Sequence, residues 1–146
     1  MLLALLMAAT TASSPAAPEA PDTLFDDFRV ATFPLNDWTF LAADETGIVF
    51  YRHPVTRHGG LPRIRIRMEF AKPQSGPTGR YLSADQVREM DCVSGLSHRV
   101  ALTLSLYRAR NLEGQALVPP DADDAWTAPT AGTLDEAVFK RACAPL

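Results

Sequence analysis

Apolar and polar residues alternate most regularly between residues 63 and 70. The apolar members of this run are Ile64, Ile66, Met68 and Phe70, and the polar members are Arg63, Arg65, Arg67 and Glu69. A period of two predicts a β-strand whose alternate side chains point to opposite faces. Because one face is apolar and the other is charged, we expect an antiparallel sheet with the charged row exposed to water.

Shorter segments with the composition of β-strands lie on both sides of this run. We predict strands at residues 38–41, 47–51 and 99–107, and a short strand at 115–118 that pairs back after a turn at 111–114. The side chains of the third segment that we expect to point inward are Val100, Leu102, Leu104 and Leu106. Glycine, proline and acidic residues predict a turn at 58–62 and loops at 72–79 and 119–124.

Two segments carry signals for a helical start. Thr133-Leu134-Asp135-Glu136 has the pattern of a capping box and predicts a helix of about three turns that ends near Cys143. Ser83 and Gln86 have the same spacing and favour a helix over residues 83–92. That second segment has no apolar stripe at helical spacing, so its own residues leave helix and strand open.

The beginning of the chain has the layout of a secretory signal peptide. Residues 1–9 are apolar, residues 10–14 are small, and residues 15–21 are rich in proline and alanine. We therefore expect residues 1–21 to be a signal peptide and linker and residues 22–146 to form one domain. No cysteine follows the apolar run, so no lipid anchor is expected, and no apolar run reaches the ~18 residues that a membrane span needs.

Cys92 and Cys143 are the two cysteines of the chain. An even number of cysteines in an exported protein indicates a disulfide, and this one would close a loop of about 50 residues and contribute about 4 kcal/mol. The alternative is an enzyme in which Cys92 is a nucleophile and His98 its base.

Composition limits the classes of function. The chain has 146 residues, 47% of them hydrophobic, which suits a single domain. Its net charge is −3, which disfavours a general nucleic-acid-binding role. The charge is uneven, because residues 48–110 hold ten arginines and one lysine against four acids, whereas the segments on both sides are acidic.

The arginine row is the strongest candidate for a binding surface. Arg63, Arg65 and Arg67 would stand ~6.6 Å apart along a strand, and their guanidinium groups could bind sulfated glycans, lipid phosphates or an acidic protein. The alternative is a solvated sheet face or one covered by acidic loop residues, namely Asp121, Asp123 and Asp124.

No sequence motif indicates catalysis, a metal or a cofactor. The histidines are His53, His58 and His98, and no carboxylate has the spacing that would complete a metal site with them. GxSxG, HExxH and glycine-rich phosphate-binding patterns do not occur in the sequence. We therefore predict a protein without catalytic residues, metal or cofactor.

A set of residues in a fixed order resembles the surface-adhesin protein E family of bacterial envelope proteins. The set comprises Trp38, Ile48-Val49-Phe50-Tyr51, Tyr81, Ser83, Asp91-Cys92, Arg99, Tyr107, Trp126, Pro129, Gly132-Thr133 and Cys143. The resemblance covers roughly residues 38–143. It implies a small α+β domain with an antiparallel sheet of about six strands, a C-terminal helix and a Cys92–Cys143 disulfide. It also implies that residues 83–92 form a strand, which we adopt.

The resemblance also implies a role. The protein after which the family is named is a surface protein that binds host matrix proteins. We therefore expect an exported, non-enzymatic envelope protein, in the periplasm or at the cell surface, that binds a matrix protein or another acidic protein or glycan ligand. The alternatives are an envelope enzyme that uses Cys92 and His98, and a purely structural periplasmic protein.

Overall fold

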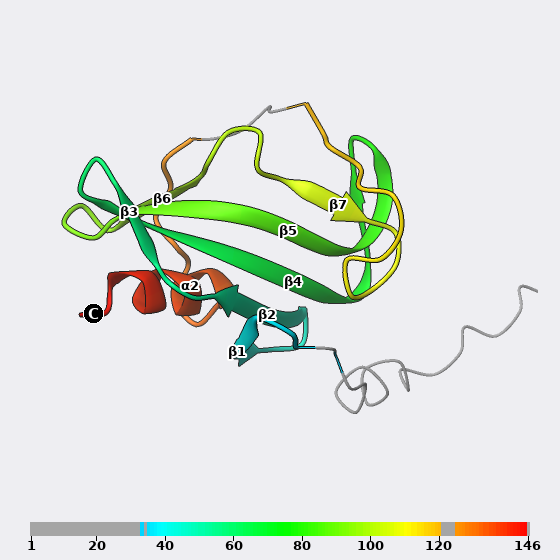
Figure 1. Ribbon diagram of the computed structural model, residues 1–146, viewed down its shortest axis with the longest axis horizontal. Helices are drawn as coiled ribbons and strands as arrows, with labels where there is room; N and C mark the ends of the chain where they lie inside the picture. The colour runs from blue at the N-terminus through cyan, green and yellow to red at the C-terminus, as the bar shows by residue number, and fades with distance from the viewer. Residues whose placement is uncertain (1–32, 34, 121–124, 146) are drawn as a thin grey trace, which may run out of the picture.

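The computed structural model describes residue 33 and the ranges 35–120 and 125–145. These residues form an antiparallel sheet and one helix (Figure 1). The elements are β1 (Trp38–Ala43), β2 (Gly47–Arg52), β3 (Thr56–His58), β4 (Leu61–Gly76), β5 (Gly79–Asp91), β6 (Leu96–Arg99), β7 (Ser105–Tyr107) and α2 (Leu134–Cys143). The predicted α+β class is confirmed, with seven strands where about six were expected. The predicted signal peptide and the acids at 121, 123 and 124 lie outside the described residues.

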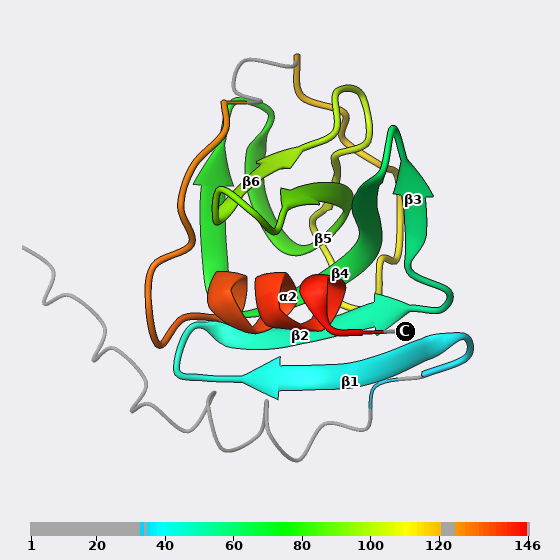
Figure 2. The same cartoon turned by 90° about the vertical axis from the view of Figure 1, so that its left-hand side faces the viewer.

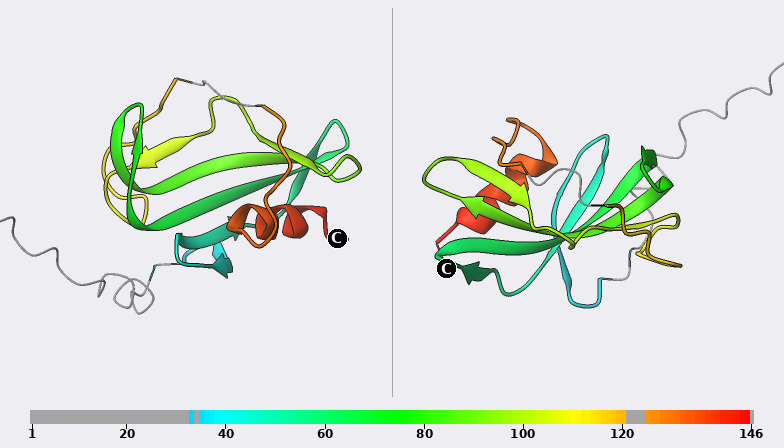
Figure 3. Two further views of the ribbon diagram at one scale, coloured as in Figure 1. Left: turned by 180° about the vertical axis from the view of Figure 1, so that it is seen from behind. Right: turned by 90° about the horizontal axis from the view of Figure 1, so that it is seen from above.

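The strands follow the order β1-β2-β4-β5-β6, and β3 and β7 add to β4 and β5. The long β4–β5 hairpin is the centre of the sheet, and its register places Arg63 opposite Glu89 and Arg67 opposite Asp85. Figure 3 shows that β1 and β2 run steeply across the direction of β4 and β5. Such a twist follows from the right-handed preference of strands and is increased where a bulge shifts the register, as between Phe40 and Ala42.

Side chains pack on both faces of the sheet. Helix α2 lies across one face (Figure 2), and the core between them consists of Val49, Tyr51, Val55, Ile64, Ile66, Met90, Leu134, Val138 and Ala142. A second, smaller cluster on the other face consists of Phe33, Trp38, Ile48, Phe50 and Ala71, with Leu112 packed against it. The face of the charged row is therefore partly covered as well.

The β4–β5 hairpin is longer than the sequence predicted. Residues 72–79 were expected to be a loop, but β4 continues to Gly76 and pairs with Gly79 at the start of β5. A register shift between Glu69 and Gln74 interrupts the alternation of apolar and polar residues from which the strand was predicted. The strand expected at 83–92 is confirmed as part of β5.

The single strand predicted over residues 99–107 is wrong. Strand β6 ends at Arg99, a turn follows, and Leu102 is 80% exposed with a φ of 60°. The Thr103 hydroxyl donates to the Val100 carbonyl oxygen at 2.6 Å and accepts from the Val87 amide at 3.1 Å. The Thr103 hydroxyl thus takes the place of a backbone acceptor for the Val87 amide. The alternation of apolar and polar residues in the sequence cannot show such a replacement.

The chain re-enters the sheet after this turn. Leu106 is buried as predicted, and its amide donates to the Leu117 carbonyl oxygen at 2.9 Å. The short strand expected at 115–118 is thus reduced to one isolated bridge.

The C-terminal helix is confirmed. Helix α2 ends at Cys143, but the Thr133 hydroxyl donates to the Thr130 carbonyl oxygen at 2.7 Å and does not cap the helix. The Glu136 carboxylate instead accepts from the Gly132 amide at 2.9 Å. Within the described residues, no helix is long and apolar enough to cross a membrane.

Candidate functional site

The arginine row lies on the sheet face opposite helix α2, and each of its arginines pairs with a carboxylate. Arg63 donates to Glu89, Arg65 donates to Asp85, and Arg67 Nε donates to Glu69 Oε1 at 2.6 Å. We call these six residues the arginine face. Asp85 lies opposite Arg67 in the register but binds Arg65, so this pair is diagonal across the hairpin. The hydrogen bond with Asp85 raises the pKa of the Arg65 guanidinium.

Exposure changes sharply along the row. The side chains of Arg63 and Arg65 are 28% and 48% exposed, whereas those of Arg67 and Glu69 are 3% and 0% exposed. The expectation that the whole charged row meets water is therefore wrong for Arg67 and Glu69. The reason is a loop after β7 that contains Asn111. The side-chain oxygen of Asn111 accepts from Arg67 Nη2 at 2.8 Å, and the backbone N–H of Asn111 donates to Glu69 Oε1 at 2.9 Å.

Further hydrogen bonds hold this covering loop on the sheet. The Ser83 hydroxyl donates to the Ala109 carbonyl oxygen at 2.7 Å and accepts from the Leu112 amide at 3.1 Å. Arg110 donates to the carbonyl oxygens of Phe70 and Ala71 at 2.6 and 3.2 Å. Burial raises the pKa of the Glu69 carboxyl, although the Arg67 charge opposes this effect, and burial lowers the pKa of Arg110. At this end of the arginine face, Arg67 and Glu69 therefore hold the covering loop on the sheet.

The opposite end of the arginine face is open and carries a histidine and an aromatic ring. His98 Nε2 lies 3.2 Å from Glu89 Oε1, and the imidazole lies 4.1 Å from the ring centre of Trp126, which is 41% exposed. Burial acts to raise the pKa of Glu89, but hydrogen bonds from Arg63 and His98 outweigh it and hold that pKa below its ordinary value. Sequence reasoning missed Glu89 as the partner, because only the β4–β5 register brings it to Arg63.

Strand β1 adds aromatic side chains to the same face. The guanidinium groups of Arg52 and Arg65 lie 4.8 and 6.0 Å from the ring centre of the buried Trp38. Phe40 is 56% exposed and contacts the edge of Phe50, whose strand neighbour in the register is Arg67. The exposed or partly exposed side chains of the arginine face and its rim thus include Phe40, Arg63, Arg65 and Trp126. We call these four residues the open surface.

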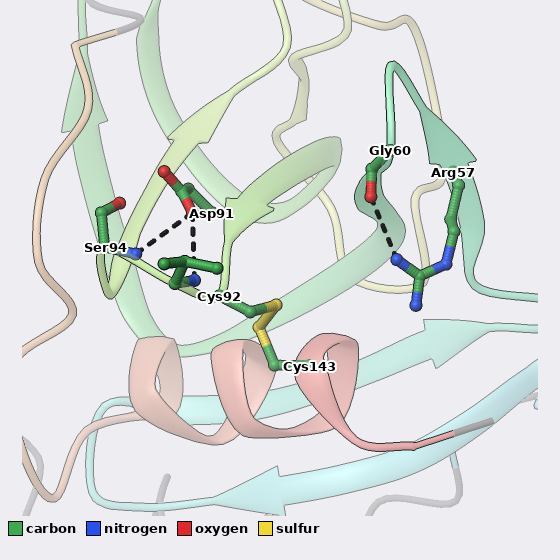
Figure 4. Close-up of a disulfide and its surroundings, with 7 residues drawn as sticks. Arg57, Gly60, Asp91, Cys92, Ser94 and Cys143 are labelled. Carbon is green, nitrogen blue, oxygen red and sulfur yellow. Dashed lines mark hydrogen bonds between the residues drawn. A yellow bond between two sulfur atoms is a disulfide. The ribbon is translucent and has the colours of Figure 1, made fainter.

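The disulfide joins Cys92 and Cys143, with Cα atoms 5.7 Å apart, and this prediction is confirmed. It ties the β5–β6 turn to the last turn of α2 (Figure 4). Asp91 fixes that turn by accepting from the amides of Val93 and Ser94 at 3.0 and 3.1 Å, and the bonds with Ser94 lower the pKa of Asp91. The sulfur that the enzymatic alternative would use as a nucleophile is thus bonded to a second cysteine.

The described residues contain no group of three His, Cys, Asp or Glu side chains arranged to hold a metal ion. His53 contacts the Tyr51 ring, with ring centres 4.6 Å apart, and His58 lies on the exposed strand β3. The three histidines are therefore distributed over different parts of the fold.

The model of a family described as surface-adhesin protein E matches residues 38–144, which include every strand and the helix that the structure describes. No curated protein and no solved structure matches the chain.

Proposed function

Because the chain belongs to the surface-adhesin protein E family, we propose that it is an exported binding protein and that its open surface contacts the partner. The observation that carries this proposal is the arrangement of exposed aromatic and arginine side chains on one sheet face. Phe40 is 56% exposed, Trp126 is 41% exposed, and the Arg65 side chain is 48% exposed. Aromatic residues and arginine are enriched where proteins bind other proteins.

The open surface is held in position before a partner arrives. Asp85 fixes the Arg65 guanidinium, and His98 supports the Trp126 ring. Side chains that are already ordered lose less conformational entropy on binding. Arg65 still presents its outer edge to solvent, where a partner's carboxylate could add to the existing pair.

The charge of the arginine face favours a protein over a polyanion as the partner of this surface. Three arginines are matched by the carboxylates of Asp85, Glu89 and Glu69, so the row has little net charge. A surface with balanced charge and exposed aromatic rings suits a partner with mixed charge and apolar area. A host matrix protein is such a partner and is the class bound by the protein after which the family is named.

Export to the periplasm or the cell surface belongs to the same proposal. The Cys92–Cys143 bridge supports it, because disulfides persist in oxidising compartments. The enzymatic alternative needs a free Cys92 thiol and a base, whereas His98 lies against Glu89. The remaining alternative is a structural protein without a ligand.

The test is binding of the purified disulfide-bonded protein to immobilised laminin, fibronectin and collagen. We expect the double variant F40S/R65Q to lose at least about tenfold in affinity for the bound matrix protein, which corresponds to the loss of ~1.4 kcal/mol. The control variant V93S/R57Q removes an exposed apolar side chain from the β5–β6 turn and an exposed arginine from strand β3. Its affinity should equal that of the wild type.

Three results would count against the proposal. Equal affinity of F40S/R65Q and the wild type would remove the open surface from the function. Equal losses in both double variants would indicate contacts that do not depend on this surface. A wild-type protein that binds none of the matrix proteins would favour the structural alternative.

A further inference from the structure

Two arginine side chains outside the arginine face have no polar or aromatic partner among the residues that the structure describes. The side chains of Arg80 on β5 and Arg108 after β7 make no hydrogen bond, ion pair or cation–π contact with any residue that the structure describes. By contrast, Arg63, Arg65 and Arg67 each bind a carboxylate. Guanidinium groups are seldom placed close together without an anion to offset their repulsion.

Both arginines line one hollow beside the tip of the β4–β5 hairpin. The hollow has a volume of about 380 Å³, and its lining residues are Pro73, Arg80, Tyr81, Leu82 and Arg108. We call it the hairpin hollow. Arg108 Nη2 reaches the hairpin turn, since it lies 4.0 Å from the position that a Cβ on Gly79 would occupy. Pairing of β7 with β5 brings Arg108 to this place.

The hairpin hollow also has a fixed aromatic wall. The Tyr81 ring packs edge-on against Phe70, with ring centres 5.4 Å apart, and burial raises the pKa of the Tyr81 phenol. Pro73 and Leu82 extend this wall with apolar surface. The site therefore combines two cationic groups with a half-buried ring.

Among the residues that the structure describes, no carboxylate lines the hairpin hollow. Glu113 lines the adjoining hollow, which shares Arg108 with this one. The sequence around the hairpin is basic, with a net charge of +7 over residues 48–110. An anion that enters therefore meets two guanidinium groups and little opposing charge within the lining residues.

We propose that the hairpin hollow binds a saccharide that carries a sulfate or phosphate ester. Two guanidinium groups match a tetrahedral oxyanion, because each can donate two parallel N–H bonds to its oxygens. The Tyr81 ring and Leu82 offer the apolar surface on which the C–H face of a sugar packs. This site is separate from the open surface, so it does not depend on the proposed partner there.

The proposal is tested by titration calorimetry with a heparin hexasaccharide as the probe for sulfate esters. The variant R80Q/R108Q should lose at least about tenfold in affinity. The matched control R57Q/K140Q removes two exposed cationic groups from β3 and α2, and its affinity should change less than about twofold. Equal losses in both variants would overturn the site, because they would show attraction to overall charge only.

Further ligands separate the parts of the proposal. N-acetylglucosamine 6-sulfate and N-acetylglucosamine 6-phosphate distinguish the two sources of the oxyanion, and binding of either one with loss in R80Q/R108Q supports the site. Inorganic sulfate should bind more weakly than both esters, and equal binding would overturn the role of the sugar.

The role of the aromatic wall is tested with two variants of Tyr81. Tyr81→Phe should keep the affinity and Tyr81→Leu should lower it, with thermal melts to verify that both fold. Unchanged affinity in a folded Tyr81→Leu variant would also overturn the role of the aromatic wall.

The variant F40S/R65Q separates this proposal from the preceding one. It should bind the hexasaccharide with the affinity of the wild type, because the hairpin hollow contains neither residue. A comparable loss in this variant would place the saccharide on the open surface and would overturn the assignment to the hairpin hollow.

Discussion

Arg67 and Glu69 form a buried ion pair although only one residue separates them on β4. Their Nε and Oε1 atoms are 2.6 Å apart, and their side chains are 3% and 0% exposed. Residues two apart on a strand share a face, so the pair needs no second strand. It does need the loop at Asn111, because Asn111 accepts a hydrogen bond from Arg67 and donates one to Glu69, and the loop excludes water.

The first prediction concerns this pair. Arg67→Met leaves the Glu69 carboxylate buried without its charge partner and should lower the free energy of unfolding by about 3–5 kcal/mol. Urea unfolding at pH 7 measures the change. The double variant R67M/E69L removes both charges and should recover most of the loss, because a buried ion pair can often be replaced by apolar side chains. A double variant as unstable as R67M would contradict this account.

Arg65→Gln is the control for that prediction. The Asp85 side chain is only 9% exposed, but Arg65 is 48% exposed and glutamine can still donate a hydrogen bond to Asp85. The substitution should therefore cost less than Arg67→Met, at about 1–2 kcal/mol. The variant R63Q/R65Q/R67Q should therefore be unstable, mainly through Arg67. The strand pattern alone places all three arginines in solvent and would predict an unchanged free energy of unfolding for this variant.

The second prediction is a pH dependence that involves Glu89. The pKa of Glu89 is lower in the folded protein than its ordinary value of 4.5, so its contribution to stability is present above that pH and is lost as the pH falls through the folded pKa. Glu89→Gln should cost about 1–3 kcal/mol at pH 7 and clearly less at pH 3. Glu45→Gln in the exposed β1–β2 turn should change stability little at either pH. An E89Q deficit that stays constant with pH would refute the role of its charge.

The third prediction concerns the disulfide. Replacing Cys143 by serine should lower the free energy of unfolding by about 2–5 kcal/mol, since the bridge closes a loop between residues 51 positions apart. Denaturant unfolding with and without a phosphine reductant measures this effect. The reductant should destabilise the wild type by the same amount and leave C92S/C143S unchanged. An unaffected wild type would show that the bridge contributes no stability.

The fourth prediction is export with cleavage. Intact-mass analysis of the protein from its own host should show the loss of roughly the first 12–21 residues. The variant L5R/L6R interrupts the apolar run and should remain at full length in the cytoplasm. A full-length wild-type protein in the cytoplasm would contradict both the signal peptide and the compartment inferred from the disulfide.

Local patterns in the sequence determined the elements that carry their own signal. The alternation from Ile64 to Met68 is a property of neighbouring residues, and it predicted the centre of β4 and its core face. The segment from Thr133 to Cys143 likewise predicted α2. The cysteine count left one pairing, which the fold realises. The resemblance to a family determined that residues 83–92 form a strand, where local signals conflicted.

The tertiary structure decided which charged residues are buried and which are exposed. Alternation places Arg65 and Arg67 on the same face, but only the loop at Asn111, 44 residues from Arg67, covers one and leaves the other open. Strand pairing likewise brings Arg80 and Arg108 to one hollow. Such contacts join residues that are far apart in the chain, and their energy depends on register and burial, which neighbouring residues do not encode.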